Sequence, residues 1–239
     1  MTKRIFQTLA ATAALVLVLS GCPTENTDNN GDGEDGLISG HIGATLAVDG
    51  VQVHTMDTSQ VIPTYPNFTD TVTLNTEPSN GTATLTNGKL TFSFGTPIDG
   101  DLENAATVMN SEFSDYNNVT TTSNDAKAAI MSLTTTGNSG LLKMDSSVSI
   151  GGTNVIGKVE SVMYIYVDKD VTVSGEGDTS TEEGVTYTYN DFTLAFKYGW
   201  NAVYKVIETT TAVGGSSSSI TETISIADNT GLKWVYITE

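Results

Sequence analysis

The chain has 239 residues, with 28 acidic and 10 basic side chains, a formal net charge of −18 and a single cysteine. Its only arginine is Arg4. Nucleic-acid binding needs cationic groups that displace counterions from phosphates, so this composition excludes DNA and RNA as partners. The same charge argues against electrostatic docking on anionic lipid head groups.

The first 21 residues have the layout of a secretory signal peptide. Lys3 and Arg4 form a short positive region, and residues 9–19 form an apolar stretch. Such a stretch is too short to span a bilayer as a helix, which needs about 20 apolar residues. We therefore expect residues 1–21 to direct export.

The residues that follow the apolar stretch are Leu19, Ser20, Gly21 and Cys22, an aliphatic residue, two small residues and a cysteine. They resemble the lipobox of bacterial lipoproteins. The resemblance implies cleavage before Cys22, a diacylglycerol group on its sulfur, and attachment to a lipid bilayer through these acyl chains. The next residue is proline rather than the aspartate that tends to retain lipoproteins in the inner membrane, which favours the outer membrane. An ordinary signal peptide with an incidental cysteine is the alternative.

Residues 22–36 contain no apolar side chain after Cys22 and Pro23, and they are rich in Asn, Asp, Glu and Gly. A segment of this composition cannot bury enough apolar surface to fold. We expect a disordered acidic tether between the anchor and the folded part.

From residue 37 onward, apolar and polar residues alternate with a period of two. Phe192, Leu194 and Phe196, for example, are separated by less apolar residues, which is typical of a strand with one buried face. Residues 162–167 are apolar on both faces and predict a central strand. The pattern predicts an all-β fold, an antiparallel β-sandwich of about ten strands with at most one or two short helices.

Turn signals and helical spacings divide this part further. The pairs Asp49-Gly50, Asn80-Gly81 and Asn87-Gly88 predict two-residue hairpins. Residues 102–109 have the apolar spacing of one short helix, and residues 126–133 are compatible with a helix or a strand. We expect an N-terminal β half, 37–98, and a C-terminal β half, 99–239, which either stand apart or share one sandwich.

Four segments carry a second resemblance. Residues 88–97, 162–173, 199–204 and 232–237 read GKLTFSFGTP, VMYIYVDKDVTV, GWNAVY and LKWVYI. They are similar to a group of uncharacterised, β-rich bacterial surface lipoproteins with a Gly-Trp-Asn turn and a terminal tryptophan strand. This resemblance implies a fold but no activity.

Candidate catalytic groups are few. The two histidines, His41 and His54, would lie about 13 Å apart across the Asp49-Gly50 hairpin, too far to share a metal. With no mature arginine and no free cysteine, the usual bases and nucleophiles are scarce. We therefore expect a protein that is not an enzyme and has no cofactor. Asp168 and Asp170 are the residues that we select for an optional loop Ca²⁺ site.

Aromatic residues in the C-terminal half give the remaining lead. Tyr198, Trp200 and Tyr204 are candidates for a ligand-binding surface, because exposed tyrosines and tryptophans on a rigid sheet contact sugars and proteins. Trp200, in the Gly-Trp-Asn turn, is expected to be the most exposed. The alternative is that these rings are core residues or cross-strand pairs.

The sequence thus predicts an outer-membrane-anchored lipoprotein whose β-sandwich ectodomain binds an unknown protein or glycan partner without catalysis. Whether the ectodomain faces the periplasm or the outside stays open. A carbohydrate-binding module, with or without Ca²⁺, and a structural envelope subunit or adhesin are the alternatives.

Overall fold

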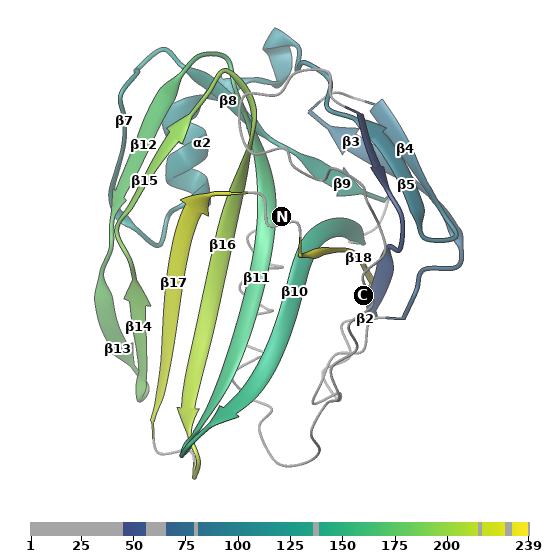
Figure 1. Ribbon diagram of the computed structural model, residues 1–239. Helices are drawn as coiled ribbons and strands as arrows, with labels where there is room; N and C mark the ends of the chain where they lie inside the picture. Colours follow the sequence, from purple (N-terminus) through teal and green to yellow (C-terminus); the bar gives the residue numbers. More distant parts are fainter. Residues whose placement is uncertain are drawn as a thin grey trace.

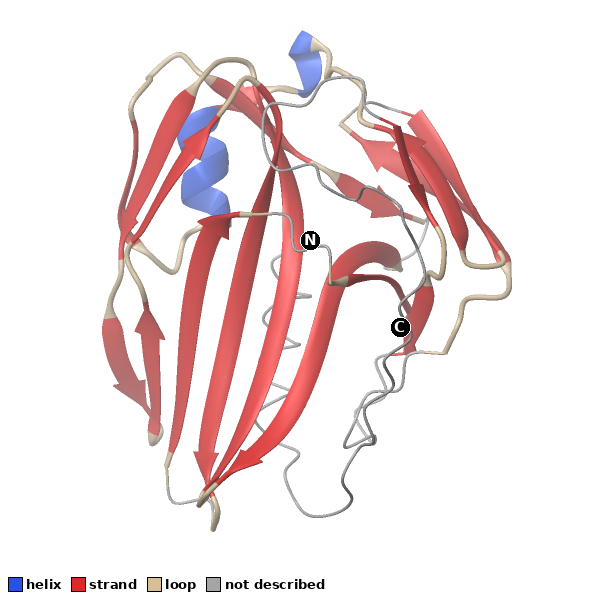
Figure 2. Ribbon diagram, viewed as in Figure 1, coloured by secondary structure: helices blue, strands red, loops and turns tan. Residues whose placement is uncertain are grey.

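The computed structural model describes residues 45–55, 66–78, 81–135, 139–214, 217–227 and 231–238. The signal peptide, Cys22, the tether and His41 lie outside these residues. Within them the chain forms eighteen strands, one α-helix and one 3-10 helix, as Figures 1 and 2 show. The all-β class is confirmed, and about ten strands was too low a number.

Six strands precede the α-helix: β1 (Thr45–Val48), β2 (Gln52–Thr55), β3 (Thr71–Glu77), β4 (Gly81–Thr86), β5 (Lys89–Ser93) and β6 (Glu103–Asn104). The helical elements are the 3-10 helix η1 (Asp99–Asp101) and α2 (Ala105–Glu112). Twelve strands follow: β7 (Asn117–Thr121), β8 (Lys127–Ile130), β9 (Ser132–Thr134), β10 (Gly140–Gly151), β11 (Asn154–Val167), β12 (Val171–Glu176), β13 (Thr179–Glu182), β14 (Val185–Tyr189), β15 (Phe192–Phe196), β16 (Gly199–Ala212), β17 (Ser218–Ile226) and β18 (Lys233–Thr238). β6, β8 and β9 are too short to show a period of two, which is one reason why the sequence understates the number of strands.

The long strands β10, β11, β16 and β17 form the centre of the molecule (Figure 1). β11 pairs with β10 and β16 along its length and with β8 near its end, so the predicted central strand is confirmed. The expectation of a purely antiparallel sandwich needs correction, because β14 pairs with β17, and β2 with β18, in parallel.

Each face of the central sheet is covered by a different part of the chain. Face A, which carries Tyr164, Trp200 and Ala202, packs against the apolar side chains of β3, β4 and β5. Face B, which carries Ile165 and Val203, packs against α2 and the small sheet β15-β12-β7. The result is a sandwich with the central sheet between two outer layers.

One short helix is present, as predicted, but it begins three residues later than the run 102–109, because Leu102 is in an extended conformation. The side chain of Asn104 accepts a hydrogen bond of 3.0 Å from the Ala106 N–H, which satisfies one of the free donors at the start of a helix. Ala105 and Met109 are buried against face B. The run 126–133, by contrast, forms strands β8 and β9 rather than a second helix.

The predicted hairpins have different outcomes. Asn87 and Gly88 join β4 to β5 with φ angles of 49° and 74°, the left-handed pair that a type I′ turn needs. That prediction is confirmed. Asn80 lies outside the described residues, and Gly81 is the first residue of β4, where it pairs with Thr76.

Asp49-Gly50 does not form a hairpin. Gly50 has a φ of 77°, as a tight turn requires, but β1 pairs with β5 and β2 pairs with β18. The predicted hairpin is therefore wrong. The distance inferred from it between the two histidines stays untested, because His41 lies outside the described residues. The chain turns there to leave one strand pair and join another.

Gly88→Ala is expected to lower the free energy of unfolding by about 1–2 kcal/mol, because an L-residue is strained at a φ of 74°. The added Cβ would also lie 3.3 Å from the Phe68 carbonyl oxygen. Gly100→Ala is the matched control, since its Cβ would meet no atom within 4 Å. Chemical denaturation of both variants tests this, and an equal stability would contradict it.

The two predicted halves share a core. Phe92 and Phe94 of β5 belong to the same buried cluster as Tyr164, Trp200 and Trp234. The ring centroids of Phe94 and Trp200 are 5.6 Å apart, and those of Phe92 and Trp234 are 5.7 Å apart. Residues on both sides of the 98/99 boundary therefore build one sandwich.

The central sheet extends well beyond these cores. β11 and β16 each have 14 residues, a length of about 46 Å, and only the part near Val162–Val167 and Gly199–Tyr204 is sandwiched between two layers. Figure 1 shows the remainder as a long twisted ribbon that ends in the β10–β11 and β16–β17 turns. We call this remainder the sheet extension: residues 147–159, 206–214 and 217–221.

Candidate functional surface

Trp200, the aromatic residue expected to be most exposed, is buried. It is 1% exposed and lies on face A between Phe94 and Tyr166, with ring centroids 5.6 and 5.5 Å away. Its indole Nε1 donates a hydrogen bond of 2.9 Å to the Gly95 carbonyl oxygen. The expectation of an exposed ring is therefore wrong, and Trp200 offers no face to a ligand in this fold.

The Gly-Trp-Asn segment has a structural role instead. The Asn201 side chain, fully buried, accepts from the Lys197 N–H at 2.9 Å and donates to the carbonyl oxygens of Lys197 and Gly199 at 2.8 Å each. These bonds hold the turn between β15 and β16 in place and thereby direct Trp200 into the core.

Tyr198 and Tyr204 are separated. Tyr198 is 47% exposed and contacts Tyr166 edge-on at 6.2 Å. Burial, followed by the hydrogen bond with Tyr198, raises the pKa of Tyr166 to about 12. Tyr204 is half-buried further along β16 and donates to the carboxylate of Glu160. The three aromatic candidates therefore do not meet in one surface, and Tyr198 is the only one of them that is exposed.

Asp168 and Asp170 both belong to the turn between β11 and β12, and each carboxylate receives protein donors. Asp168 accepts from the Lys127 N–H at 2.8 Å. Asp170 accepts from the Lys197 ammonium at 2.8 Å and from the Tyr198 N–H at 2.9 Å, and these bonds lower its pKa. Within the described ranges, no group of three or more His, Cys, Asp or Glu side chains is placed to hold a metal ion.

A buried ionic cluster lies on face B at the edge of the core. The Lys205 ammonium is 2.8 Å from one Glu222 carboxylate oxygen, and the two side chains are 14% and 8% exposed. The Tyr116 hydroxyl donates to the other oxygen at 3.2 Å. Burial and then the Glu222 charge raise the pKa of Tyr116. The cluster links the segment after α2 to β16 and β17.

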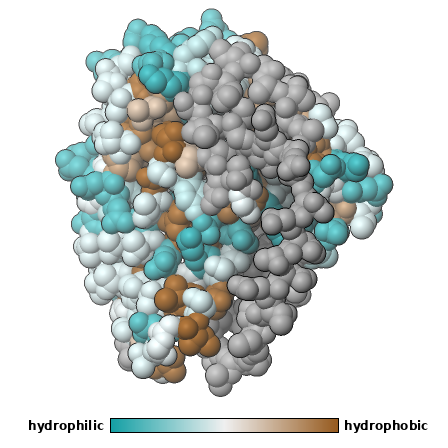
Figure 3. Space-filling view, in the orientation of Figure 1, coloured by the Kyte–Doolittle hydropathy of each residue, from teal (hydrophilic) through white to brown (hydrophobic). Residues whose placement is uncertain are grey.

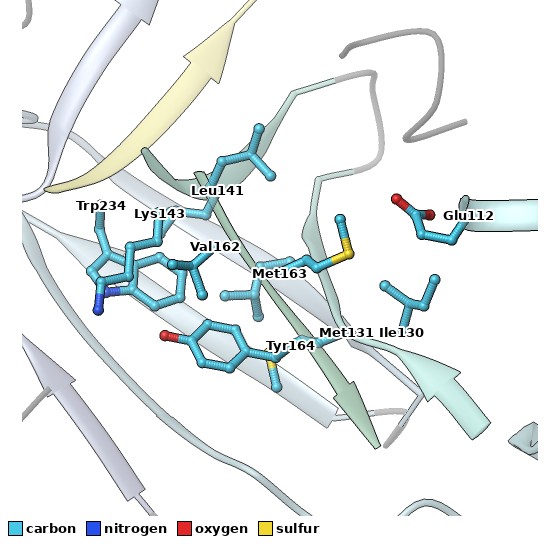
Figure 4. A pocket seen from close by; sticks show the side chains of 11 residues that line it. Glu112, Ile130, Met131, Leu141, Lys143, Val162, Met163, Tyr164 and Trp234 are labelled. Carbon is cyan, nitrogen blue, oxygen red and sulfur yellow. The ribbon is translucent and has the colours of Figure 1, made fainter. Parts of the chain in front are cut away.

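A small cavity of about 40 Å³ lies between β8–β9, β10 and β11. Figure 4 shows mostly apolar side chains around it, with Lys143 and Trp234 on one side and Glu112 on the other. This volume accommodates a few water molecules but not an organic substrate. It therefore offers no active-site cleft.

The sheet extension is the one surface that the sequence did not single out. Three of the five large apolar side chains that are exposed among the described residues lie near its end: Val148 at 45%, Ile150 at 77% and Val213 at 66%. The Val213 N–H donates to the Thr153 carbonyl oxygen at 2.8 Å, so the two turns lie side by side. Figure 3 shows apolar residues gathered at the lower end of the molecule.

The two faces of this extension differ in chemistry. Val148, Ile150, Val155 and Val159 lie on face B by their register with β11 and β16. Face A carries serines, threonines and charged residues in the same region, with Ile156 and Val206 as exceptions. An amphipathic sheet whose apolar face extends past its covering layer is typical of an interaction surface.

Charge is also distributed unevenly along the long axis of the sheet. Residues 146–157 and 209–221 contain no charged residue. The opposite end of β11 and β16 carries the ion pairs Lys169–Asp125 at 2.9 Å and Lys197–Asp170 at 2.8 Å. Among the described residues, Asp145 and Glu208 border the two uncharged segments, and the β13–β14 turn brings Glu182 and Glu183 near the same end. The sheet therefore has a charged end and an uncharged, apolar end.

Comparisons of the chain with protein-family models, with curated proteins and with solved structures found no match. Among the described residues, none of the helices has the length and apolar character needed to cross a bilayer.

Proposed function

We propose that this protein is a lipid-anchored protein of the bacterial outer membrane, with a non-catalytic β-sandwich ectodomain that binds a partner at the envelope. The observation that carries the binding role is the end of the sheet extension, where Val148, Ile150 and Val213 are exposed within the uncharged segments 146–157 and 209–221. Monomeric proteins rarely leave such a group uncovered without an interaction to explain it.

The anchor is supported by the sequence at Cys22 and by its position in the chain. Cys22 precedes β1, which begins at Thr45, by a segment that reaches at most about 80 Å when extended. Two or more acyl chains give stable attachment to a bilayer. The ectodomain is therefore held near the membrane but free to find a partner there.

The carbohydrate-binding alternative has less support. It depends on an exposed aromatic platform, whereas Trp200 is 1% exposed and Tyr204 is half-buried. Of the three aromatic candidates, Tyr198 alone is exposed.

Cys22→Ala is expected to abolish incorporation of labelled palmitate and to move the protein from the membrane to the soluble fraction, because the anchor needs the thiol. Ser20→Ala is the matched control, since it keeps a small residue at that position and should be labelled normally. Intact-mass analysis of the mature wild-type protein provides the direct measurement. An unmodified Cys22 in that mass would refute the anchor.

A further inference from the structure

The apolar end of the sheet extension has no partner among the described residues. Val148 and Ile150 lie on face B of β10. On the same face, Met144 is buried with Val235 and Ile237 in a small cluster of its own, and neither Val148 nor Ile150 belongs to a buried cluster. No described strand pairs with the outer edge of β10 from Ser147 to Gly151. The adjacent turn adds Val213, which is 66% exposed.

We propose that this end of the sheet, formed by the β10–β11 turn, Val148, Ile150 and Val213, is a membrane-contact site that inserts its apolar side chains into the surface of a neutral, zwitterionic bilayer. The inference rests on the proposed function, because the anchor at Cys22 keeps the ectodomain within reach of such a surface. It goes beyond that function by naming the partner of the exposed apolar surface.

Charge is the first argument for lipid. The whole chain has a net charge of −18, yet residues 146–157 and 209–221 carry no charge. A charged side chain is costly in the hydrocarbon region, whereas Val, Ile, Gly, Ser and Thr are tolerated there or at the interface. The composition of these two turns therefore matches the requirements of a segment that contacts lipid.

The neighbouring acidic residues indicate which head-group charge the lipid should have. Glu182 and Glu183 in the β13–β14 turn flank the uncharged end, and Val185 next to them pairs with Ser218 of β17. These carboxylates would be repelled by anionic head groups and would stay in water. They restrict the contact to the corner built by β10, β11 and β16, and to a bilayer surface without excess negative charge.

A second copy of the chain is the competing occupant. Pairing of two β10 edges would satisfy the backbone groups of the open edge. It would extend the sheet and leave Val148 and Ile150 uncovered on face B, and Val213 uncovered in the neighbouring turn. Pairing with a second copy would also not explain why residues 209–221 carry no charge. A bilayer surface contacts both turns at once, so the observations favour lipid.

The test uses the acylated full chain on phosphatidylcholine vesicles, with an environment-sensitive dye on Ile150→Cys. The acylated Cys22 does not react with the dye, so the introduced thiol is labelled alone. Thr84→Cys, exposed on β4, is the matched control. We expect a blue-shifted emission and quenching by spin-labelled lipid at position 150, and neither change at position 84.

A second substitution examines the other turn. Val213→Asp in the Ile150→Cys protein should remove most of the quenching, because a carboxylate cannot enter the bilayer surface at low cost. Thr120→Asp, on exposed β7, should leave it unchanged. Both positions are exposed, so the fold is expected to remain intact, and circular dichroism checks this.

Each other outcome has a defined meaning. The same emission at positions 150 and 84 on vesicles overturns the proposal. A blue shift that appears without vesicles, grows with protein concentration and resists lipid quenching also overturns it, and assigns the surface to a second copy. An intact mass that shows Cys22 without acyl chains refutes the anchor but not the contact site. The contact site is then tested in a Cys22→Ser background by the same quenching, where equal emission at both positions again overturns it.

Discussion

Lys205→Met is expected to lower the free energy of unfolding by about 3–5 kcal/mol, because it leaves the buried Glu222 carboxylate without its ammonium partner. The two charged atoms are 2.8 Å apart, and the side chains are 14% and 8% exposed. Tyr116 supplies one remaining hydrogen bond at 3.2 Å, which does not compensate a buried negative charge. Urea denaturation measures the change directly.

The chain provides a close control for this experiment. Lys197 and Asp170 form a bridge of the same length, 2.8 Å, but both side chains are 60% exposed. Exposed bridges contribute little, so Lys197→Met should cost about 1 kcal/mol or less. If the two lysine variants lose the same stability, burial is not what makes the Glu222 pair important.

The double variant Lys205→Met, Glu222→Leu separates the charge from the packing. Replacing both partners of a buried ion pair by apolar side chains is often neutral or stabilising. We expect it to recover most of the stability that Lys205→Met loses. A double-mutant cycle then gives the coupling free energy between the two residues, and a value near zero would contradict the buried pair.

Trp200→Ala is expected to lower the free energy of unfolding by about 3–5 kcal/mol. The substitution removes the largest side chain of the core that is less than 2% exposed, together with its contacts to Phe94 and Tyr166 and the hydrogen bond to Gly95. Tyr198→Ala, two residues earlier and 47% exposed, should cost far less. Thermal unfolding of the two variants gives the comparison.

This pair of variants also affects how binding experiments are interpreted. A loss of glycan binding in Trp200→Ala would follow from the loss of the core and would say nothing about a sugar site. Tyr198→Ala is the informative variant, because it keeps the fold while removing the exposed ring. Nearly equal stability of the two variants would mean that Trp200 is not a core residue.

The sequence predicted the features that depend on neighbouring residues. The type I′ turn at Asn87-Gly88 needs only two residues that accept positive φ between two strands. The presence of α2 follows from apolar spacing alone, although its Asn104 cap was not predicted. β11 was recognised as central because residues 162–167 are apolar on both faces. In each case the signal lies within a few positions of the element.

Long-range pairing accounts for the failures. Asp49-Gly50 has the same turn chemistry as Asn87-Gly88, but β1 finds its partner at β5 and β2 finds its partner at β18. Trp200 was expected to be exposed because it follows a glycine in an apparent Gly-Trp-Asn turn. Its burial comes from Phe94, which is more than a hundred residues earlier in the chain. No local pattern carries such information.

The sheet extension was missed for a related reason. Val148 and Ile150 alternate with serines in the way that any half-buried strand does. The period of two says which side chains share a face, but not whether another layer covers that face. Only the three-dimensional arrangement shows that neither residue belongs to a buried cluster.

The pairing of β2 with β18 affects when the sheet can form. β18 lies between β10 and β2. β2 (Gln52–Thr55) therefore cannot join the sheet until β18, roughly 180 residues later in the chain, has been synthesised. Contacts of such long sequence separation slow folding. A chain that crosses a membrane with its N-terminus first would thus be kept from completing its sheet in transit. The topology therefore makes completion of this part of the sheet depend on the last strand of the chain.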